Sequence, residues 1–598
     1  MQPIFAKIEF ENDGASAAVK ESENIIAFPV HSDQRKPNRS PKQFGPYEVA
    51  GTFDLANRRA LADQLQLPRD ASAEQCIALG YDKWGLELLP RLKGEFAFVL
   101  KCMKTRQIIA VRDRFGVQPL AYSVHEGALS FASDPEALAG DQINPVWIAQ
   151  FLSGIQASAT LTPYEGVKKL APGTVLVADQ NGLNLHTWYK LRPQYVPEAD
   201  APELIREALE AAIARMSVGQ TATLLSGGLD SSALTLLRAR MAHDPVRALS
   251  MVYPDYPMLD ESTYIDAVVD ANPNIEGTKV PMFAPSHSEE ILKILEQQGQ
   301  PIIIQNFGTT ASAYQTASKI GAHCVLDGHG GDEVVGNGGW YLNELAKSHQ
   351  YFALWRNVRA HKSRFDQPAI GMSLFEVLAA AGPRPIAAIA RRLAPTSPIA
   401  GVPWRRLVKE DLVQATDLVG KANEGIGRSN THLEGQERLH AQQLCAPHTG
   451  SSFEILRRMA RAEGIDVKFP FYDQDFVELC LGQSSKAKFG DGLTRNLLRE
   501  AMRGIYPEKI RTRTSKADFT PYVTKGLAEC DAVKKLKKGV PETLKDYVSA
   551  KGVQETLSDL KDGRNLATVS GEISRLAQLD IWLTNRKTTA NSSRKNDV

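Results

Sequence analysis

Hydrophobic and polar positions form short alternating runs over roughly the first 190 residues of the chain. The runs AFVLKC, QIIAVRD, LAYSVHEGALSFAS and TVLVADQNGLNLHTWY are separated by Gly, Pro and Asn, a pattern typical of β-strands joined by turns. The Glu-Gly and Asn-Gly pairs inside the last two runs predict tight hairpins. This part of the chain is therefore predicted to be an α+β unit with mostly antiparallel sheet.

The pattern changes after residues 192–200, a polar segment that contains prolines. A helix is predicted next, with Leu204, Ala208, Leu209, Ala212, Ile213 and Met216 on one side. The strand-like runs TATLL, RALSMVY and HCVLDG then alternate with the helical run SSALTLLRARMA and with a helix from about Glu261. Alternating strands and helices predict a parallel sheet with right-handed crossovers.

Residues 340–445 contain Pro- and Ala-rich helical patterns with little strand character, and helical patterns continue to DIWLTNR near the end. The final residues are polar. We therefore predict a first domain over residues 1–195 and a second over 196–585, with a helical insertion at about 340–445. Residues 586–598 are predicted to be a disordered tail.

Composition narrows the classes of partner. The chain has 598 residues, enough for several domains, and 70 basic against 69 acidic residues give a net charge of +1. Such a balance favours neither a nucleic-acid nor a membrane partner. The six cysteines form no Cys-x-x-Cys pair, and no uncharged run is long enough to span a membrane. We expect a cytoplasmic protein in a reducing compartment.

The stretch LLSGGLDSSALTLL, residues 224–237, places a glycine loop between a strand and a helix. Such a loop presents free backbone N–H groups and the positive end of a helix dipole, which together bind anions. The predicted nucleotide-binding residues are Leu224, Ser226, Gly227, Gly228, Asp230, Ser231 and Ser232. The alternative is an ordinary helix start, capped by serines and favoured by an acid.

Asp230 indicates which anion the loop binds. A carboxylate beside phosphates requires a cation between them, so Asp230 predicts Mg²⁺ held together with phosphate oxygens. The loop lacks the lysine of the phosphate loop that serves γ-phosphoryl transfer. We expect ATP, bound through its Mg-pyrophosphate part. A second glycine-bearing loop, GHGGDE, ends the strand HCVLDG, and open α/β sheets bind ligands at these strand ends.

Several segments resemble a known family. SGGLDSS resembles the pyrophosphate-binding loop of ATP-pyrophosphatase enzymes, and DGHGGDEVVGNGGWY and GIDVKFPFYD resemble segments of the asparagine synthetase superfamily. RLKGEFAFVL, VRDRFGVQPLAY and LSFASDPEAL are similar to its glutaminase-like domain. The matches cover most of residues 45–530 in the right order. The resemblance implies an Ntn-type (N-terminal nucleophile) antiparallel sandwich domain followed by a doubly wound parallel-sheet synthetase domain with helical additions.

The resemblance also implies a reaction and a site. A carboxylate is adenylated by ATP and attacked by an amine, which releases AMP and pyrophosphate. By this likeness Asp230 and Asp332 both face Mg²⁺, and Gly328 lies near the phosphates. Lys516, in RTSKADF, matches a lysine that steadies the pyrophosphate and the reacting intermediate. The alternative for Lys516 is a solvated surface lysine.

The first domain departs from the family pattern. Members that hydrolyse glutamine carry Cys directly after Met1, whereas this chain has Gln2. Residues 31–45 do not match the arginine-bearing segment that holds glutamine in the family. We therefore expect no glutaminase activity and a scaffold role for residues 1–195. Relatives that share this loss close rings, namely β-lactam-forming synthetases and lasso peptide cyclases.

His329 and Asp466 are the residues that discriminate among these relatives. Asparagine synthetases generally have Glu at position 329 and β-lactam synthetases have Tyr. An imidazole can take the proton of an attacking ammonium, so we hypothesise that His329 is the base and that Asp466 pairs with it. The alternative is structural: His329 bonds its own loop, and Asp466 braces Lys468 or a helix end.

We expect an ATP-dependent synthetase that activates an Asp or Glu side chain of a core peptide, so that the peptide's N-terminal amine closes a macrolactam ring. The helical 340–445 segment and the ending GEISRLAQLDIWL favour a lasso peptide cyclase. The expected partners are the precursor peptide, a leader-binding protein and a leader peptidase. The alternatives are a small-molecule lactam synthetase, an ammonia-dependent asparagine synthetase, and a non-catalytic regulator that binds nucleotide or peptide. The aromatic residues Trp340, Tyr341, Tyr351, Phe352 and Trp355 fit either a peptide groove or a helical core.

Overall fold

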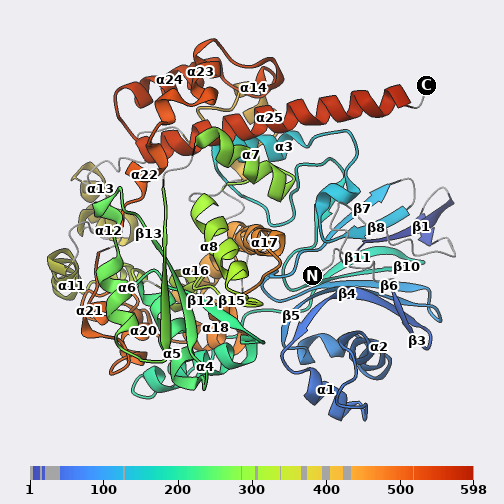
Figure 1. Ribbon diagram of the computed structural model, residues 1–598, viewed down its shortest axis with the longest axis horizontal. Coiled ribbons are helices and arrows are strands. Elements are labelled where there is room, and N and C mark those ends of the chain that lie inside the picture. Colours follow the sequence, from blue (N-terminus) through green and yellow to red (C-terminus); the bar gives the residue numbers. More distant parts are fainter. Residues whose placement is uncertain are drawn as a thin grey trace.

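The computed structural model, shown as a ribbon in Figure 1, places a β-rich body and a mostly helical body with a central sheet side by side under a long C-terminal helix. It describes residues 5–13, 16–19, 41–125, 128–283, 286–303, 307–336, 338–364, 374–393, 404–421, 432–515 and 517–596.

The N-terminal domain contains two antiparallel sheets. The five-stranded sheet has the order β2-β1-β8-β7-β9 and the six-stranded sheet has the order β11-β10-β6-β5-β4-β3. The strands of the first sheet are β1 (Phe5–Asp13), β2 (Ser16–Val19), β7 (Ala121–His125), β8 (Ala128–Ala132) and β9 (Val167–Lys169). Those of the second are β3 (Lys42–Phe44), β4 (Tyr47–Leu55), β5 (Gly94–Cys102), β6 (Gln107–Arg112), β10 (Thr174–Asp179) and β11 (Gly182–Thr187). The predicted antiparallel sandwich is confirmed.

Strand β5 shows why the sequence alternates so little at this point. Val99 packs in a core cluster with Phe131 of β8, while Phe98 packs in another cluster with Ile77 of helix α2 (Ala73–Trp84). A strand that is covered on both faces needs apolar residues on both faces. Helices α1 (Arg58–Gln64) and α2 cover the outer side of the six-stranded sheet in Figure 1.

Both predicted hairpins are present. Strands β7 and β8 pair from Ala121↔Ala132 to His125↔Ala128, and β10 pairs with β11 up to Asp179↔Gly182. The second loop therefore consists of two residues, and Gly182 follows it with a φ of +112°. A glycine relieves the strain of this backbone conformation.

The second domain is built on a parallel sheet with the order β14-β13-β12-β15-β16. Its strands are β12 (Thr221–Leu224), β13 (Val246–Val252), β14 (Ile275–Pro281), β15 (Cys324–Leu326) and β16 (Asp466–Lys468). All four neighbouring pairs are parallel. This confirms the predicted parallel sheet. The edge strands β14 and β16 were not predicted, because β14 exposes most of its side chains and β16 has only three residues.

Helices cover the sheet on two faces. On one face α4 (Ala201–Met216) packs against α5 (Leu229–Met241), α18 (Gln474–Leu481) and α20 (Asn496–Ala501). On the other, α17 (Pro447–Ala462) packs against β16 and α8 (Phe307–Lys319), and α8 packs against β13. This domain also contains the helices α6 (Ser262–Val269), α7 (His287–Gln298), α9 (Gly331–Val335), α16 (Gly435–Leu444), α19 (Ser485–Phe489) and α21 (Glu508–Arg511).

The described part of residues 340–445 is mainly helical. Besides α16 it contains α10 (Trp340–Lys347), α11 (Tyr351–Arg364), α12 (Leu374–Ala381), α13 (Arg384–Leu393) and α14 (Glu410–Ala415). Near the C-terminus lie α22 (Thr520–Thr524), α23 (Asp531–Lys537) and α24 (Ala550–Lys561), which pack against the long helix α25 (Leu566–Asn596). Helix α25 also reaches α3 (Pro145–Ser153), where Trp582 packs in one cluster with Phe151. It thus connects the two domains.

One expectation about the C-terminus was wrong. Disorder was predicted from residue 586, yet α25 continues through these polar residues to Asn596. Extending an existing helix adds a backbone hydrogen bond per residue without a new nucleation cost, so a polar sequence can continue it. The polar composition alone therefore misjudged this segment.

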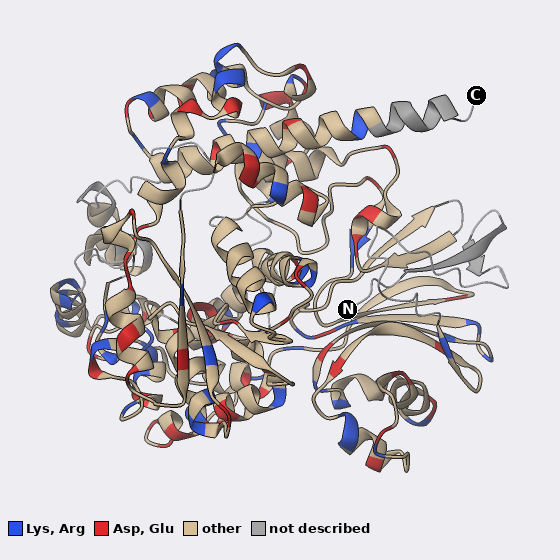
Figure 2. Cartoon of the chain, in the orientation of Figure 1, with Lys and Arg blue, Asp and Glu red and all other residues tan. Residues whose placement is uncertain are grey.

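Figure 2 shows acidic and basic residues intermixed over both domains, in line with the balanced net charge. Among the described helices, none combines the length and the apolar character that crossing a membrane requires.

Candidate active site at the ends of strands β12 and β15

The loop after β12 is shaped for close backbone approach. Gly227 has a φ of +70°, and a Cβ atom there would lie 2.6 Å from Cβ of Tyr264, so only glycine fits. Ser231 Oγ accepts a hydrogen bond from the Ser226 backbone N–H at 3.1 Å and lies 3.0 Å from Ser226 Oγ. Gly228 caps α5 without any side-chain cap, which leaves the helix N-terminus open to a ligand.

The predicted nucleotide-binding residues of this loop differ in how they face the open end of α5. Ser226 is exposed and Ser231 is buried but bonded to it, so both belong to the rim of the loop. Leu224 ends β12 and contributes to the strand. The Ser232 side chain is fully buried, so its hydroxyl does not line the open face, because α5 turns it toward the core.

The loop after β15 lies directly against the first loop. A Cβ atom on Gly331 would lie 2.3 Å from Cγ of Asp230, and one on Gly328 would lie 3.1 Å from the Ser231 nitrogen. The two glycines therefore allow the loops to meet. Sequence reasoning predicted this meeting from strands 100 residues apart in the chain; the parallel pairing of β12 with β15 produces it.

A residue that sequence reasoning missed joins the two acids. The Arg495 guanidinium forms ion pairs with Asp230 and, at 2.6 Å, with Asp332. Arg495 precedes α20 with a φ of +60°, and burial lowers its pKa to about 10. The sequence TRNLLRE does not indicate this role of Arg495, because the role depends on a left-handed backbone conformation and on packing between distant segments.

The donor set fits Mg²⁺ that arrives with a nucleotide. Within the described ranges, no group of three or more His, Cys, Asp or Glu side chains is placed to hold a metal ion. Mg²⁺ bound with a nucleotide needs only one or two carboxylates, since phosphate oxygens and water complete its octahedron. Asp230 and Asp332 supply two carboxylates around one point that a cationic group already occupies.

The segment before Lys516 is fixed to the glycine loop. Arg513 Nη1 donates to the Gly227 carbonyl at 2.8 Å, its guanidinium pairs with Glu261, and it stacks 4.0 Å over the Tyr264 ring. Lys516 itself lies outside the described residues.

The predicted pair of His329 and Asp466 does not form. His329 donates its backbone N–H to Asp327 at 2.9 Å, and its half-buried ring meets Phe453 and Phe469 edge to face. Asp466 pairs in register with Cys324, at the far end of β15 from His329. Parallel strands rise about 3.3 Å per residue, so this register separates the two side chains.

Asp466 instead binds Lys468 at 2.9 Å and Arg457 at 3.3 Å. Among the described residues, no hydrogen bond or ion pair joins it to His329. The structural alternative therefore holds for Asp466. The family motif gave its position in the sequence but not the register of β16.

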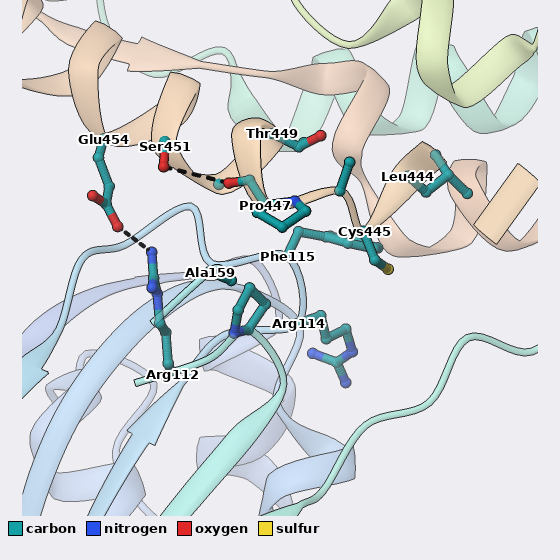
Figure 3. Close-up of a pocket in the computed structure, with 13 residues that line it drawn as sticks. Arg112, Arg114, Phe115, Ala159, Leu444, Cys445, Pro447, Thr449, Ser451 and Glu454 are labelled. Carbon is teal, nitrogen blue, oxygen red and sulfur yellow. Dashed lines mark hydrogen bonds and ion pairs between the residues drawn. The ribbon is translucent and has the colours of Figure 1, made fainter. Parts of the chain in front are cut away.

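A cavity of about 20 Å³ lies between the two domains, near the start of α17 (Figure 3). It is bordered by Phe115 and Thr449, and Glu454 forms an ion pair with Arg112 at 2.7 Å at one side. A space of this size holds about one water molecule and no nucleotide. None of the predicted site residues lines it.

Comparison with known proteins agrees with these features. The family described as asparagine synthase matches residues 204–584, and the glutamine amidotransferase domain family matches residues 56–189. Asparagine synthetase [glutamine-hydrolyzing] 3 of Bacillus subtilis is 22% identical over 531 residues, which cover 83% of this chain and 79% of that protein. Amidase chry2 of Gibberella zeae is 33% identical over 193 residues, but this match spans only 30% of this chain and 29% of that protein.

Among solved structures, a glutamine phosphoribosylpyrophosphate amidotransferase from B. subtilis covers 48% of this chain and 77% of its own, at 13% identity and a TM-score of 0.21. A TM-score this low supports no conclusion about the fold or function of this chain. The asparagine synthase match, in contrast, spans well over half of the chain and includes both acidic loops. The protein therefore belongs to the asparagine synthase family, a family of ATP-dependent carbon–nitrogen ligases.

Proposed function

We propose that this protein adenylates the side-chain carboxylate of an Asp or Glu in a core peptide and lets the peptide's N-terminal amine attack it. The product is a macrolactam of the lasso peptide type. The observation that carries the ATP-dependent step is the contact between the two glycine loops, which brings Asp230 and Asp332 to one guanidinium.

The nucleotide phosphates would lie over the loop of Ser226, Gly227 and Gly228, at the open N-terminus of α5. Bound Mg²⁺ would neutralise charge that develops on the phosphates. Asp230 and Asp332 would hold it, and Arg495 would then be free to turn toward phosphate oxygens.

The reaction balances in two steps. A carboxylate oxygen attacks the α-phosphorus of ATP, which forms an acyl-adenylate and releases pyrophosphate. The amine nitrogen then attacks the acyl carbon, the bond from carbon to the AMP oxygen breaks, and the amine gives up a proton. His329, on the second loop, would accept this proton without help from Asp466. Lys516 would steady the departing pyrophosphate.

Intramolecular attack favours ring closure, because holding both groups in one site supplies a high effective concentration. The peptide would lie along the helical segment that begins at α10. Phe352 and Trp355 of α11 are exposed, at 75% and 45%, and α11 contacts the loop that carries Arg495 through a hydrogen bond from His361 Nδ1 to the Gly492 carbonyl. Exposed aromatic side chains are typical of surfaces that bind peptides.

The proposal includes the precursor peptide, a leader-binding protein and a leader peptidase as partners, since the leader must be removed before the new N-terminus can react. It also places the protein in the cytoplasm. All six cysteines are free, which suits a reducing compartment.

ATP–pyrophosphate exchange tests the proposal. Exchange that depends on a peptide with an N-terminal Gly and an Asp or Glu several residues later, with a product that has lost one water, would support it. Exchange with free aspartate instead would indicate an asparagine synthetase that uses ammonia, and exchange with a small amino acid that cyclises would indicate a lactam synthetase. Absence of both exchange and ATP binding would indicate a non-catalytic regulator.

A further inference from the structure

A cluster of five charged side chains lies where the N-terminal domain meets strand β16. Lys468 of β16 forms ion pairs with Asp54 of β4, with Glu95 of β5 at 3.5 Å and with Asp466 at 2.9 Å. Arg457 of α17 pairs with Glu95 at 2.9 Å. Lys468 is nearly inaccessible, with 2% of its side chain exposed, so this is a buried connection between the two domains.

The backbone of the same residue reaches the second glycine loop. The Lys468 carbonyl accepts a hydrogen bond from the Asp327 N–H at 2.9 Å. One oxygen of the Asp327 carboxylate accepts from the His329 N–H at 2.9 Å, and the other accepts from the Tyr314 hydroxyl at 3.0 Å. Lys468 thus faces the N-terminal domain through its side chain and the catalytic loop through its main chain.

Strand β16 is fixed partly by its buried apolar side chain, Val467, and partly by the ion cluster. It is three residues long and lies at the edge of the sheet, where β15 is its one strand neighbour among the described residues. Its ladder with β15 has three residue pairs, and the buried Val467 sets which face of the strand turns to the core, so the ion cluster adds to a register that packing already favours. Burying charges is costly, and apolar residues of similar size often stabilise a core better. An ion cluster at this place therefore contributes specificity of position more than stability.

We propose that Lys468 is a positioning residue through which Asp54 and Glu95 of the N-terminal domain fix β16 against β15. This in turn fixes the loop of residues 327–332. The N-terminal domain then has a role in the synthetase reaction that requires no chemistry of its own. The inference rests on the proposed function only for its catalytic readout.

The test compares Asp54→Asn and Lys468→Met with Lys93→Met in the full-length protein. Lys93 also joins the two domains, through an ion pair with Asp475 at 3.0 Å, but both partners are about half exposed and neither belongs to β16. Asp54→Asn changes a partly exposed residue of the N-terminal domain, so it provides the answer if Lys468→Met does not fold.

The first readout is amide hydrogen exchange of residues 323–333, measured without any substrate. We expect exchange on the order of tenfold faster in Asp54→Asn and Lys468→Met, about the effect of weakening one hydrogen bond, and no change in Lys93→Met. The second readout is pyrophosphate exchange. We expect kcat to fall by about tenfold or more in the two cluster variants, with partial rescue in Lys468→Arg, while KM for Mg·ATP changes less.

Unchanged amide exchange in residues 323–333 of folded Asp54→Asn and Lys468→Met would overturn the inference. So would an equal effect of Lys93→Met, since that would indicate general loosening of the domain contact. If the wild-type protein shows no pyrophosphate exchange with any substrate, the proposed function fails, while amide exchange still decides the positioning role.

Discussion

Replacing Gly331 by alanine places a methyl group between the two acidic loops. Its carbon would lie 2.3 Å from Cγ of Asp230, 2.4 Å from Oδ1 and 2.9 Å from Cβ. Non-bonded carbon atoms pack best at about 3.5–4.0 Å, so Asp230 must turn away or the loops must separate by about an ångström. Either response removes one carboxylate from the proposed Mg²⁺ position.

The size of the effect follows from this displacement. Overpacking of a well-packed site costs about 1–3 kcal/mol, which the fold can absorb. Disturbing the groups that orient a metal ligand lowers metal affinity by about 10–100-fold. We therefore expect Gly331→Ala to fold and to raise the KM for Mg·ATP in pyrophosphate exchange by about the same factor.

Two other glycines provide graded controls. A Cβ atom on Gly328 would lie 3.1 Å from the Ser231 nitrogen and 3.3 Å from Asp230 Cβ, so Gly328→Ala should have a weaker effect. Gly140→Ala meets no atom within 4 Å and should behave as wild type. A wild-type KM for Mg·ATP in folded Gly331→Ala would show that the two loops do not share one metal ion.

Three further predictions follow from the charges of the site and the domain contact. Arg495→Met removes the cation that contacts both acids, so the free energy of unfolding of the ligand-free protein should fall by up to about 3 kcal/mol, with the smaller share from the half-exposed Asp332. Mg²⁺ should then raise the melting temperature of the variant more than that of wild type. An equal rise would contradict a site shared by the cation and Mg²⁺. Burial raises the pKa of Glu95, although Lys468 and Arg457 oppose this shift, so the folded protein keeps the Glu95 proton to higher pH than the unfolded chain does. The free energy of unfolding, measured in urea, should therefore fall as the pH rises from the ordinary glutamate range through the raised pKa. Glu95→Gln should remove this slope, and a slope that persists would contradict the prediction. His329→Ala should slow ring closure by about 10²-fold, whereas Asp466→Asn should slow it far less, because Asp466 lies at the far end of β15. Closure at the wild-type rate in His329→Ala would end its assignment as the base.

Local signals predicted the framework of the site well. The loop around Gly227 and Asp230 combines an apolar strand, residues that permit a sharp turn and an apolar helix, and each of these is visible in a short window of sequence. The second loop is recognised from an equally short window of sequence. Once two strands are parallel neighbours, their following loops must lie at the same edge, so the approach of the two acids could be predicted.

The side-chain partners could not be predicted in the same way. Arg495 reaches both acids because of its positive φ and because α20 packs against α4, and neither feature can be predicted from the local sequence. Asp466 was placed beside His329 by a motif, but the motif does not state the register of a three-residue strand. The actual partners of Asp466 are Arg457 of α17 and Lys468 of β16. Arg457 in turn binds Glu95 of the N-terminal domain, which lies more than 350 residues away in the chain.

In the proposed reaction, the two loops direct a carboxylate to the innermost phosphorus of ATP. Turnover of a peptide labelled with heavy oxygen in its side-chain carboxylate shows which phosphorus atom is attacked. Attack at the innermost phosphorus leaves the label in AMP, accompanied by unlabelled pyrophosphate, and this is the result we expect. Label in inorganic phosphate, accompanied by ADP, would contradict it, because the attack would then have taken place at the terminal phosphorus.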